Sequence, residues 1–444
     1  MLKSKKSKKG MDESVVNYEY DDLYRLSKKD FPSGTDTELE HYANGLLKKM
    51  KDASGEKRYY YDDADRLTKI EQGPIGFAVG TDQNYVLEYV WNAASQLTQM
   101  KLTLRTQSMK TWAYTYTDDG YLDVVTNPDA EAAKHEYLTD GRLKKITLKN
   151  NQIGKKETRE YFYQDTNDSH SYISNKNKHL RRTLDKKNDG TTIISECNYE
   201  LDKAGIRRSM TDKDEKYNAF LYDPLYQLKA ETKWSQKTGG SREYQYAYVF
   251  DPNGNRIVEH HDGVMKSFDY GGNNEMLSAG GVDFTYDHFG NTKTKVDGSG
   301  TTTYNYDFEN HLVNIDFPNT ANDDDHEYDG VGRRMRSKLN GAGDWTNFIF
   351  DELTDNLICE YTLISGTFTI KSLNTWGIGL ISTNREGTKR YFHFDGLGST
   401  AALTDFDMNV TDTYVYSAFG VTESSSGSSV NPFRFVGQWG YYDD

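Results

Sequence analysis

The segment Tyr328-Asp-Gly-Val-Gly-Arg-Arg-Met335 carries the pattern that decides the fold of this chain, because the same pattern recurs along it. In each copy an aromatic residue and an aspartate are followed by a turn and a return strand. Fuller copies are Tyr61-Asp-Asp-Ala-Asp-Arg-Leu67, Phe250-Asp-Pro-Asn-Gly-Asn-Arg-Ile257 and Tyr286-Asp-His-Phe-Gly-Asn291. Units this short cannot bury an apolar face alone and must stack on their neighbours, so the sequence predicts one continuous repeat array.

Each copy is expected to form two strands joined by a tight turn. Runs such as Tyr244-Gln-Tyr-Ala-Tyr248 place their rings on one face of a strand, since side chains alternate with period two. The Asp, Asn and Gly residues that follow suit a hairpin with primed-turn dihedrals. Near Tyr116, Tyr137 and Tyr199 the aspartate is displaced by one or two places, which indicates a drifted register.

The residues expected to form the structural repeat motif are Tyr61, Asp62, Tyr222, Asp223, Phe250, Asp251, Gly254, Asn255, Tyr286, Asp287, Gly290, Tyr306, Asp307, Tyr328, Asp329, Gly332 and Arg333.

Composition indicates an all-β protein with little helix. The 444 residues include 34 Tyr and 37 Gly, and no long window shows an apolar period of 3.6 residues. Apolar residues make up 35% of the chain, which is low for a solid core of this length. Tyr can bury its ring while its hydroxyl stays hydrated, so we expect a Tyr-rich sheet face that borders water or a hollow.

Charge and cysteine content exclude several classes of site. The net charge of −14 argues against a nucleic-acid partner, because phosphate binding needs a basic surface. Cys197 and Cys359 lie far apart and outside any CxxC spacing, so neither a zinc site nor a disulfide framework is expected. Both are predicted to be buried free thiols, and no metal or cofactor is expected.

Residues 1–17 begin with a lysine-rich run and are predicted to be a basic, disordered tail. No apolar segment follows these charges, as a signal peptide would require. The sequence also lacks a run of about 18 apolar residues that could span a membrane. These observations leave the localisation open.

Four blocks follow one another near the C-terminus: Tyr391-Phe-His-Phe-Asp-Gly-Leu-Gly-Ser-Thr400, Ala402-Leu-Thr-Asp405, Tyr414-Val-Tyr-Ser-Ala-Phe-Gly420, and Asn431-Pro-Phe-Arg-Phe-Val-Gly-Gln438 with Tyr441-Tyr442-Asp443. In these blocks and in its repeats the chain resembles the Rhs/YD-repeat family with its C-terminal Rhs-associated core. The resemblance implies a β-sheet that spirals into a hollow shell, as in bacterial Rhs proteins, the C components of toxin complexes and teneurins. It also implies a YD array over 18–350, a core over 351–444, and a secreted or cell-surface protein.

The residues that this resemblance assigns to the Rhs core motif are His393, Asp395, Gly396, Leu397, Gly398, Ser399, Asn431, Pro432, Arg434, Phe435, Gly437, Gln438, Tyr442 and Asp443.

Structural roles are expected for the polar residues of this motif. A lone His between aromatic residues, as at His393, is typical of a hydrogen-bonded structural residue rather than a general base. Asp395 is interpreted as a turn residue. The segment 431–435 is predicted to be a strand in which Arg434 pairs with a carboxylate.

Self-cleaving members of the family continue beyond the Tyr-Tyr-Asp block into Asp-rich motifs, whereas this chain ends at Asp444. Asp443 and Asp444 would point to opposite faces of a strand, which disfavours a catalytic pair. We therefore expect a chain truncated before the self-cleavage and toxin region, and not an enzyme.

Three functions remain open. The first is a non-enzymatic shell segment that encloses or presents a polypeptide, with a polypeptide cargo or a shell-closing chain as partner. The second is a carbohydrate-binding or adhesion module that holds glycans on a Tyr- and Asp-rich sheet face. The third is a glycoside hydrolase, which needs two carboxylates about 5 to 10 Å apart. An open sheet also has unpaired edges, so self-association is expected.

Overall fold

The computed structural model describes residues 4–9, 12–78, 82–149, 156–163, 179–319, 322–341 and 343–443. Strands make up nearly all of the regular structure in these ranges. The registers between strands are antiparallel and join strands that follow one another in sequence, as for β6 and β7 (Gly55–Tyr61 and Leu67–Gly73). The prediction of an all-β fold with little helix is therefore confirmed.

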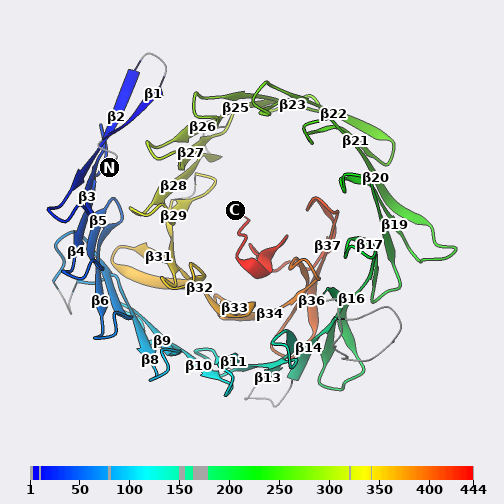
Figure 1. Cartoon of the computed structure of the whole chain (residues 1–444), viewed down its shortest axis with the longest axis horizontal. Helices are drawn as coiled ribbons and strands as arrows, with labels where there is room; N and C mark the ends of the chain where they lie inside the picture. The colour runs from blue at the N-terminus through cyan, green and yellow to red at the C-terminus, as the bar shows by residue number, and fades with distance from the viewer. Residues whose placement is uncertain are drawn as a thin grey trace. The chain divides into compact units, whose positions relative to one another are not determined.

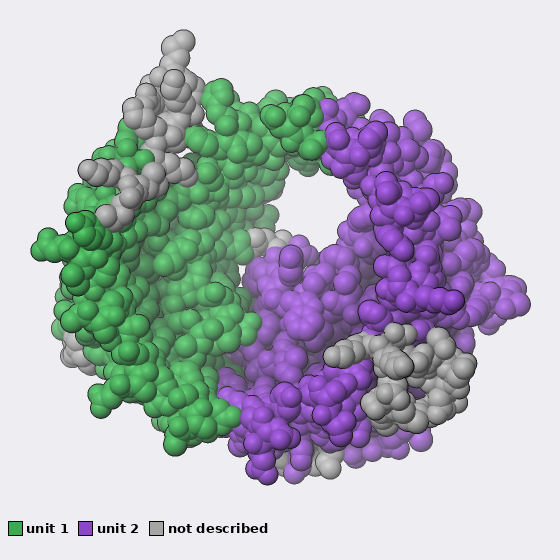
Figure 2. Space-filling model, in the orientation of Figure 1, with its two compact units in different colours: residues 1–113, 271–371 green, residues 114–270, 372–444 purple. Residues whose placement is uncertain are grey.

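The chain forms two compact units and enters each of them twice (Figure 2). Unit 1 comprises residues 1–113 and 271–371, and unit 2 comprises residues 114–270 and 372–444. We call the first stretch of each unit its early layer and the second stretch its late layer. These interleaved units differ from the division at residue 350 that the sequence suggested, because contacts group segments far apart in the chain.

The early layer of unit 1 contains β1 (Ser4–Lys9), β2 (Asp12–Tyr20), β3 (Leu26–Asp30), β4 (Thr37–His41), β5 (Leu47–Asp52), β6, β7, β8 (Tyr85–Trp91) and β9 (Leu97–Leu104). Its late layer contains β23 (Met276–Ala279), β24 (Asp283–Tyr286), β25 (Thr292–Asp297), β26 (Gly300–Tyr306), β27 (Leu312–Asp316), β28 (Asp324–Tyr328), β29 (Arg334–Lys338), β30 (Thr346–Phe350) and β31 (Leu357–Ile364).

The early layer of unit 2 contains β11 (Leu122–Thr126), β12 (Ala132–Tyr137), β13 (Leu143–Lys149), β14 (Lys156–Tyr163), β15 (Leu180–Lys187), β16 (Ile193–Leu201), β17 (Arg207–Asp212), β18 (Tyr217–Tyr222), β19 (Leu228–Trp234), β20 (Arg242–Phe250), β21 (Arg256–His261) and β22 (Val264–Tyr270). Its late layer contains β33 (Gly379–Arg385), β34 (Thr388–Phe394), β35 (Thr400–Thr404), β36 (Val410–Tyr416), β37 (Thr422–Ser426) and the 3₁₀ helix η2 (Gly437–Trp439). The strands β10 (Lys110–Tyr116) and β32 (Thr367–Gly377) run from unit 1 into unit 2.

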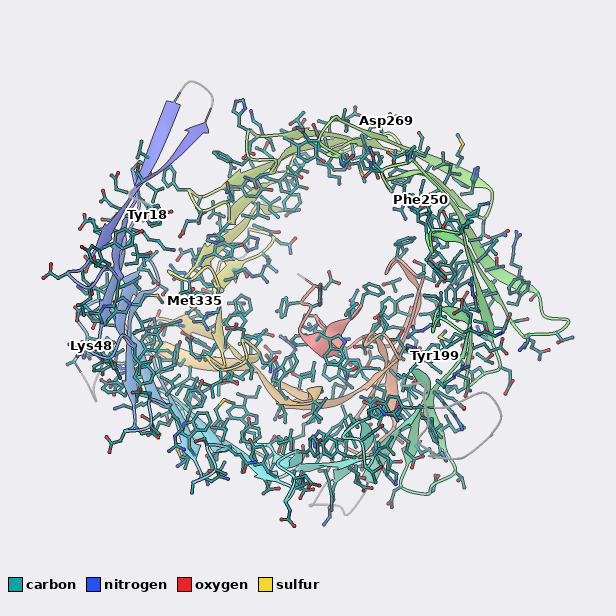
Figure 3. All side chains as sticks on the ribbon, viewed as in Figure 1. Tyr18, Lys48, Tyr199, Phe250, Asp269 and Met335 are labelled. Atoms are coloured by element: carbon teal, nitrogen blue, oxygen red, sulfur yellow. The ribbon has the colours of Figure 1, made fainter. Side chains whose placement is uncertain are left out.

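Within each unit the late layer packs against the early layer (Figure 1). In unit 2, Ile381 of β33 joins a buried cluster with Val125, Ala133 and Ile146 of the early layer. In unit 1, the ring of Phe31 from the early layer stacks on Phe308 from the late layer, with centroids 6.3 Å apart. Side chains fill the space between the layers, as seen around Tyr199 in unit 2 and Met335 in unit 1 (Figure 3). Each unit is therefore held together by burial between its two layers.

The tyrosine run of β20 shows how one strand face is used. Tyr244, Tyr246 and Tyr248 are 5%, 2% and 3% exposed and share one face, as the alternation predicted. The Tyr246 hydroxyl donates to Glu423 Oε1 at 2.7 Å, and the ring of Tyr248 meets Phe419 edge-on at 5.0 Å. This face is thus covered by the late layer of unit 2, so the expectation that it borders water or a hollow is wrong here.

Two other expectations can be compared directly with the structure. Both cysteines are buried and free, as predicted. The disordered tail is not observed in residues 4–9 and 12–17, which form β1 and most of β2. Backbone pairing explains the difference, because β1 runs antiparallel to β2 and a strand ladder does not require apolar side chains.

The repeat turn differs from the primed hairpin that we expected. In the copy at Asp62, the Asp62 N–H donates to Arg66 O and the Asp65 N–H donates to Asp62 O, both at 3.0 Å. Asp65 alone in this loop has a positive φ, 60°, and the register shifts at Tyr61. This is a three-residue loop with a bulge, in which one left-handed residue at the third position is sufficient. Gly254, Gly290 and Gly332 occupy this position in their copies.

The register does not drift in the uneven copies. Thr117 and Leu138 stand in the aspartate position, since their N–H groups donate across the turn to Tyr121 O and Arg142 O, each at 2.8 Å. Near Tyr199, Asp202 takes that position and its N–H donates to Ile206 O at 2.9 Å. The register drift predicted from the sequence was therefore wrong, because the backbone turn is the same as in the other copies and only the residue types change.

Candidate functional site: contacts between the two layers of each unit

The aspartate of each repeat organises its own turn. In the copy at Asp329, the carboxylate Oδ1 accepts the N–H groups of Val331 at 3.1 Å and Arg333 at 3.0 Å. The same two positions donate to Asp62, Asp223, Asp251, Asp287 and Asp307. The aspartate thus holds the second loop residue and the first residue after the loop, while the N–H of the first loop residue points elsewhere.

The aromatic residue before the aspartate connects neighbouring repeats. The Tyr328 hydroxyl donates to Leu312 O of the preceding repeat at 2.9 Å, and the Tyr286 hydroxyl donates to Met276 O at 2.7 Å. Trp91 Nε1 donates to Leu67 O at 2.8 Å in the same way. In the aromatic-Asp pair, the aromatic side chain therefore bonds to the previous repeat and the aspartate bonds to N–H groups of its own turn.

In the late layers, the remaining N–H binds the early layer. Four late-layer turns in the described ranges donate the N–H of their first loop residue to an early-layer side chain, and we call these contacts interlayer clamps. They are Gly330 to Asp52 Oδ2 at 2.6 Å, Glu352 to the Tyr89 hydroxyl at 3.0 Å, Gly396 to the Tyr199 hydroxyl at 2.6 Å, and Ala418 to Glu231 Oε2 at 2.7 Å. Two clamps lie in each unit.

Two of the clamps require glycine because the layers approach closely. A Cβ on Gly330 would lie 2.5 Å from the Thr37 methyl carbon, and one on Gly396 would lie 2.6 Å from the Tyr199 ring. Neither glycine has a positive φ. The requirement is therefore steric and comes from the other layer, not from the turn itself.

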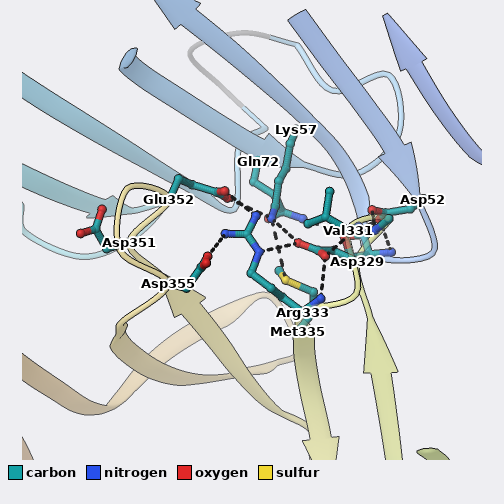
Figure 4. A network of polar contacts seen from close by, with 12 residues as sticks. Asp52, Lys57, Gln72, Asp329, Val331, Arg333, Met335, Asp351, Glu352 and Asp355 are labelled. Atoms are coloured by element: carbon teal, nitrogen blue, oxygen red, sulfur yellow. Dashed lines mark hydrogen bonds and ion pairs between the residues drawn. The ribbon is translucent and has the colours of Figure 1, made fainter. Parts of the chain in front are cut away.

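Beside the first clamp, unit 1 contains a buried network of charges (Figure 4). Lys57 Nζ, on a side chain that is 3% exposed, lies 2.9 Å from Asp329 Oδ2 and 3.2 Å from Glu352 Oε1. Arg333 pairs with both carboxylates and, at 3.2 Å, with Asp355. Burial opposes ionisation of Asp329, but the charges of Lys57 and Arg333 outweigh it and lower its pKa. The network thus ties the repeat turn of β28–β29 to β6.

Unit 2 contains a second buried network, centred on His393. Its Nε2 lies 3.3 Å from Glu157 Oε2 and 3.1 Å from the Thr404 hydroxyl, and its Nδ1 lies 3.3 Å from Asp185 Oδ1. Arg159 donates to Asp185 at 2.7 Å and to Phe392 O at 2.5 Å. Burial disfavours the imidazolium, but Glu157 and Asp185 outweigh it and raise the pKa of His393 to about 9. His393 therefore joins the late layer to β14 and β15 as a charged structural residue.

The two blocks of the Rhs core motif meet in unit 2. Thr400 N–H donates to Arg434 O and Gln438 N–H donates to Gly398 O, both at 2.9 Å. Val436 N–H donates to the Ser399 hydroxyl at 3.1 Å. As predicted, Asp395 is a turn residue, with Oδ1 accepting the N–H groups of the loop after it.

The rest of the motif anchors the segment 431–443 to the β34–β35 hairpin. Phe433, 1% exposed, meets the rings of Trp376 and Tyr442 edge-on. The strand predicted over 431–435 is not formed; instead Val436 turns the backbone with φ 57° into η2, and Phe435 packs on Tyr416. Arg434 lies 3.8 Å from the carboxylate of Asp443, as predicted. Asn431 Oδ1 caps the Phe433 N–H, Pro432 O accepts the Asp443 N–H, and Gly437 N–H donates to Arg434 O.

The acceptors of the clamps, Asp52, Tyr89, Tyr199 and Glu231, were not predicted because they stand in no recognisable sequence motif. The donor residues do show a difference in sequence. The first loop residue is Gly or Ala in three of the clamps, whereas the early-layer turns at Asp223 and Asp251 have Pro224 and Pro252, which carry no N–H.

The described residues contain no group of three or more His, Cys, Asp or Glu side chains placed to hold a metal ion. They also contain no helix with the length and apolar character needed to cross a membrane.

Comparisons with known proteins agree with this architecture. The Teneurin YD-shell family model matches residues 206–444, and the RHS Repeat model matches residues 41–73. A curated tRNA3(Ser)-specific nuclease WapA from Bacillus spizizenii is 28% identical over 147 residues, which are 31% of this chain and 6% of that protein.

Solved structures show the same fold. A crystal structure of TcdB2-TccC3-Cdc42 has a TM-score of 0.54 and 13% identity, covering 96% of this chain and 28% of that chain. A Photorhabdus luminescens Tc holotoxin pore has a TM-score of 0.53 and 13% identity, covering 94% of this chain and 26% of that chain. This chain thus spans less than a third of the length of these two structures and of the nuclease.

Gly330→Ala is expected to destabilise the protein by about 1 to 3 kcal/mol, because the added methyl group would overpack the contact with Thr37. Gly272→Ala is the matched control, since Gly272 has the same place in another late-layer turn of unit 1 and a Cβ there would meet nothing within 4 Å. Chemical denaturation of the two variants measures the difference. Equal stability of both variants would contradict the steric account.

Lys57→Met is expected to cost about 3 to 5 kcal/mol of unfolding free energy, because it leaves Asp329 buried with one cationic partner fewer. Lys51→Met removes the exposed pair with Glu38 and is expected to change stability by less than about 1 kcal/mol. The comparison uses urea unfolding at neutral pH. A cost for Lys57→Met as small as that for Lys51→Met would contradict the role of the network.

The His393 network predicts a loss of stability at alkaline pH. The folded pKa of about 9 lies above the ordinary value of 6.5, so the contribution is complete below about pH 6.5 and is lost as pH rises through 9. Unfolding free energy measured between pH 6 and 9.5 is expected to fall more steeply for the native sequence than for His393→Gln. Parallel curves would show that His393 is not charged in the folded protein.

Proposed function

Because the chain belongs to the teneurin YD-shell family and is therefore a structural shell segment, we propose that it encloses a polypeptide and performs no catalysis itself. The observation that carries this proposal is the set of interlayer clamps. They bond a second layer of sheet onto the first in each unit, which is the contact that a wall of overlapping sheet requires.

The surroundings of the polar groups in the repeat and in the Rhs core motif support a structural role. His393 is 1% exposed and is held by two carboxylates, so a substrate cannot reach it without unfolding the layer above it. In Asp329, for example, Oδ1 accepts the turn N–H groups and Oδ2 pairs with Lys57 and Arg333, so both oxygens have structural partners. The nuclease name of the curated relative carries no inference for this chain, which spans 6% of that protein.

A partner chain that completes the shell is part of the proposal. This chain covers 26–28% of the length of the structures that share its fold, and two of those are structures of TcdB2-TccC3. A wall of that size would need further sheet from the same or another polypeptide. The glycan-binding alternative has less support, because the tyrosine row of β20 is buried.

Protease protection of an appended peptide tests enclosure. An unstructured peptide with one cleavage site is fused after Asp444, next to the segment anchored on the late layer, and in a second variant before Met1. We expect the C-terminal peptide to be cut at least tenfold more slowly, and the protection to fall in the Gly396→Ala variant. Equal cleavage of the two peptides would overturn the proposal that the chain encloses a polypeptide.

A further inference from the structure

Unit 1 contains a cavity of about 230 Å³ between its two layers, next to the clamp at Gly330. Its early-layer wall comes from the β3–β4 loop, with Phe31, and from Asp52 at the end of β5. Its late-layer wall comes from the turns after β26 and β28. The contacts between the two layers described above do not account for this cavity.

Acidic groups predominate on the cavity wall. Five carboxylates line it, those of Asp52, Asp307, Glu309, Glu327 and Asp329, and no Lys or Arg is found among the described lining residues. His311 lies in the lining and pairs with Asp307 at 2.9 Å, whereas two other basic partners contact their carboxylates from outside the lining. Lys29 pairs with Glu309 at 2.7 Å and Arg336 with Glu327 at 2.8 Å. A ligand in the cavity therefore meets the acidic side of these pairs.

Asp52 differs from the other four carboxylates. It is 4% exposed, and within the described residues it accepts hydrogen bonds from the Gly330 N–H and from the N–H and hydroxyl of Ser54 but forms no ion pair. Burial raises the pKa of this carboxyl, and these hydrogen bonds and the charge of Lys57 offset the effect only in part. A cation in the cavity would add a further compensating charge without displacing the clamp.

Two aromatic rings in the lining make the cavity more suitable for a planar cation than for an ammonium group. Phe31 and Phe308 line the cavity with their rings 6.3 Å apart and inclined by 18°. Ring faces attract cations, and a guanidinium stacks on them more readily than an ammonium because it is planar and less strongly hydrated. Its fork of N–H donors also matches a carboxylate such as Asp52.

We propose that this cavity binds a guanidinium group, presented as an arginine side chain of a polypeptide, which lies against the stacked pair of Phe31 and Phe308 and donates to the Asp52 carboxylate. The site depends on unit 1 alone, so it stands whether or not the chain encloses a cargo. It gives the protein a means of holding a basic segment that approaches this unit.

Titration of the full-length chain with N-acetyl-arginine methylamide tests the site, with the citrulline analogue as a neutral probe of the same shape. Isothermal calorimetry or ligand-observed NMR is expected to show at least tenfold tighter binding of the arginine probe. Asp52→Asn is expected to weaken it at least tenfold. Glu38→Gln, which removes an exposed carboxylate of the same unit outside the cavity lining, is expected to leave binding unchanged.

Three outcomes would overturn the proposal: no detectable arginine binding at millimolar concentration, equal affinity for the citrulline probe, or equal affinity for the corresponding lysine probe. Because Asp52→Asn also touches a clamp, its thermal unfolding is measured alongside. Phe308→Leu provides a second variant that keeps every carboxylate, and undiminished binding in this variant would likewise overturn the assignment to the two rings.

Discussion

Most of the repeat turns depend on one interaction, in which a side-chain oxygen in the aspartate position accepts two backbone N–H groups of its own turn. At Asp329 these donors are Val331 and Arg333, and the same arrangement recurs in other copies, such as those at Asp21 and Asp62. A charged acceptor makes strong bonds to backbone donors, so the turn is fixed before any contact with another layer. The aspartate does not bind the N–H of the first loop residue. This N–H is therefore available to the other layer of the unit.

The layers of each unit are joined by polar contacts as well as by apolar burial. Lys57 in unit 1 and His393 in unit 2 are buried cations, and each is paired with two carboxylates of the opposite layer. Breaking such a set by removing one member is costly, whereas its net contribution over an apolar core is modest. Its main effect is therefore to specify which strands face each other, because a shifted layer would leave these charges buried and unpaired.

The sequence predicted the all-β fold and the aspartate turns because both depend on contacts within about five residues. It also brought together His393–Ser399 and 431–438 as one motif, and the structure joins them through Thr400, Arg434, Gly398 and Gln438. It could not identify Asp52, Tyr89, Tyr199 or Glu231 as clamp acceptors, since each contact spans more than 180 residues. The strand expected at 431–435 failed for the same reason: packing of Phe433 on Trp376 outweighed local strand propensity.

The spacing of the clamps fixes the curvature within each unit. In unit 1, the turns after β28 and β30 bond to β5 and β8, and in unit 2 the turns after β34 and β36 bond to β16 and β19. Between the two clamps of a unit there are two strand spacings in the late layer and three in the early layer. The late layer therefore lies on the concave side. With strands about 4.8 Å apart and layers about 10 Å apart, this ratio corresponds to local radii of about 20 and 30 Å. The bending of the sheet is therefore set by which turn N–H finds which acceptor.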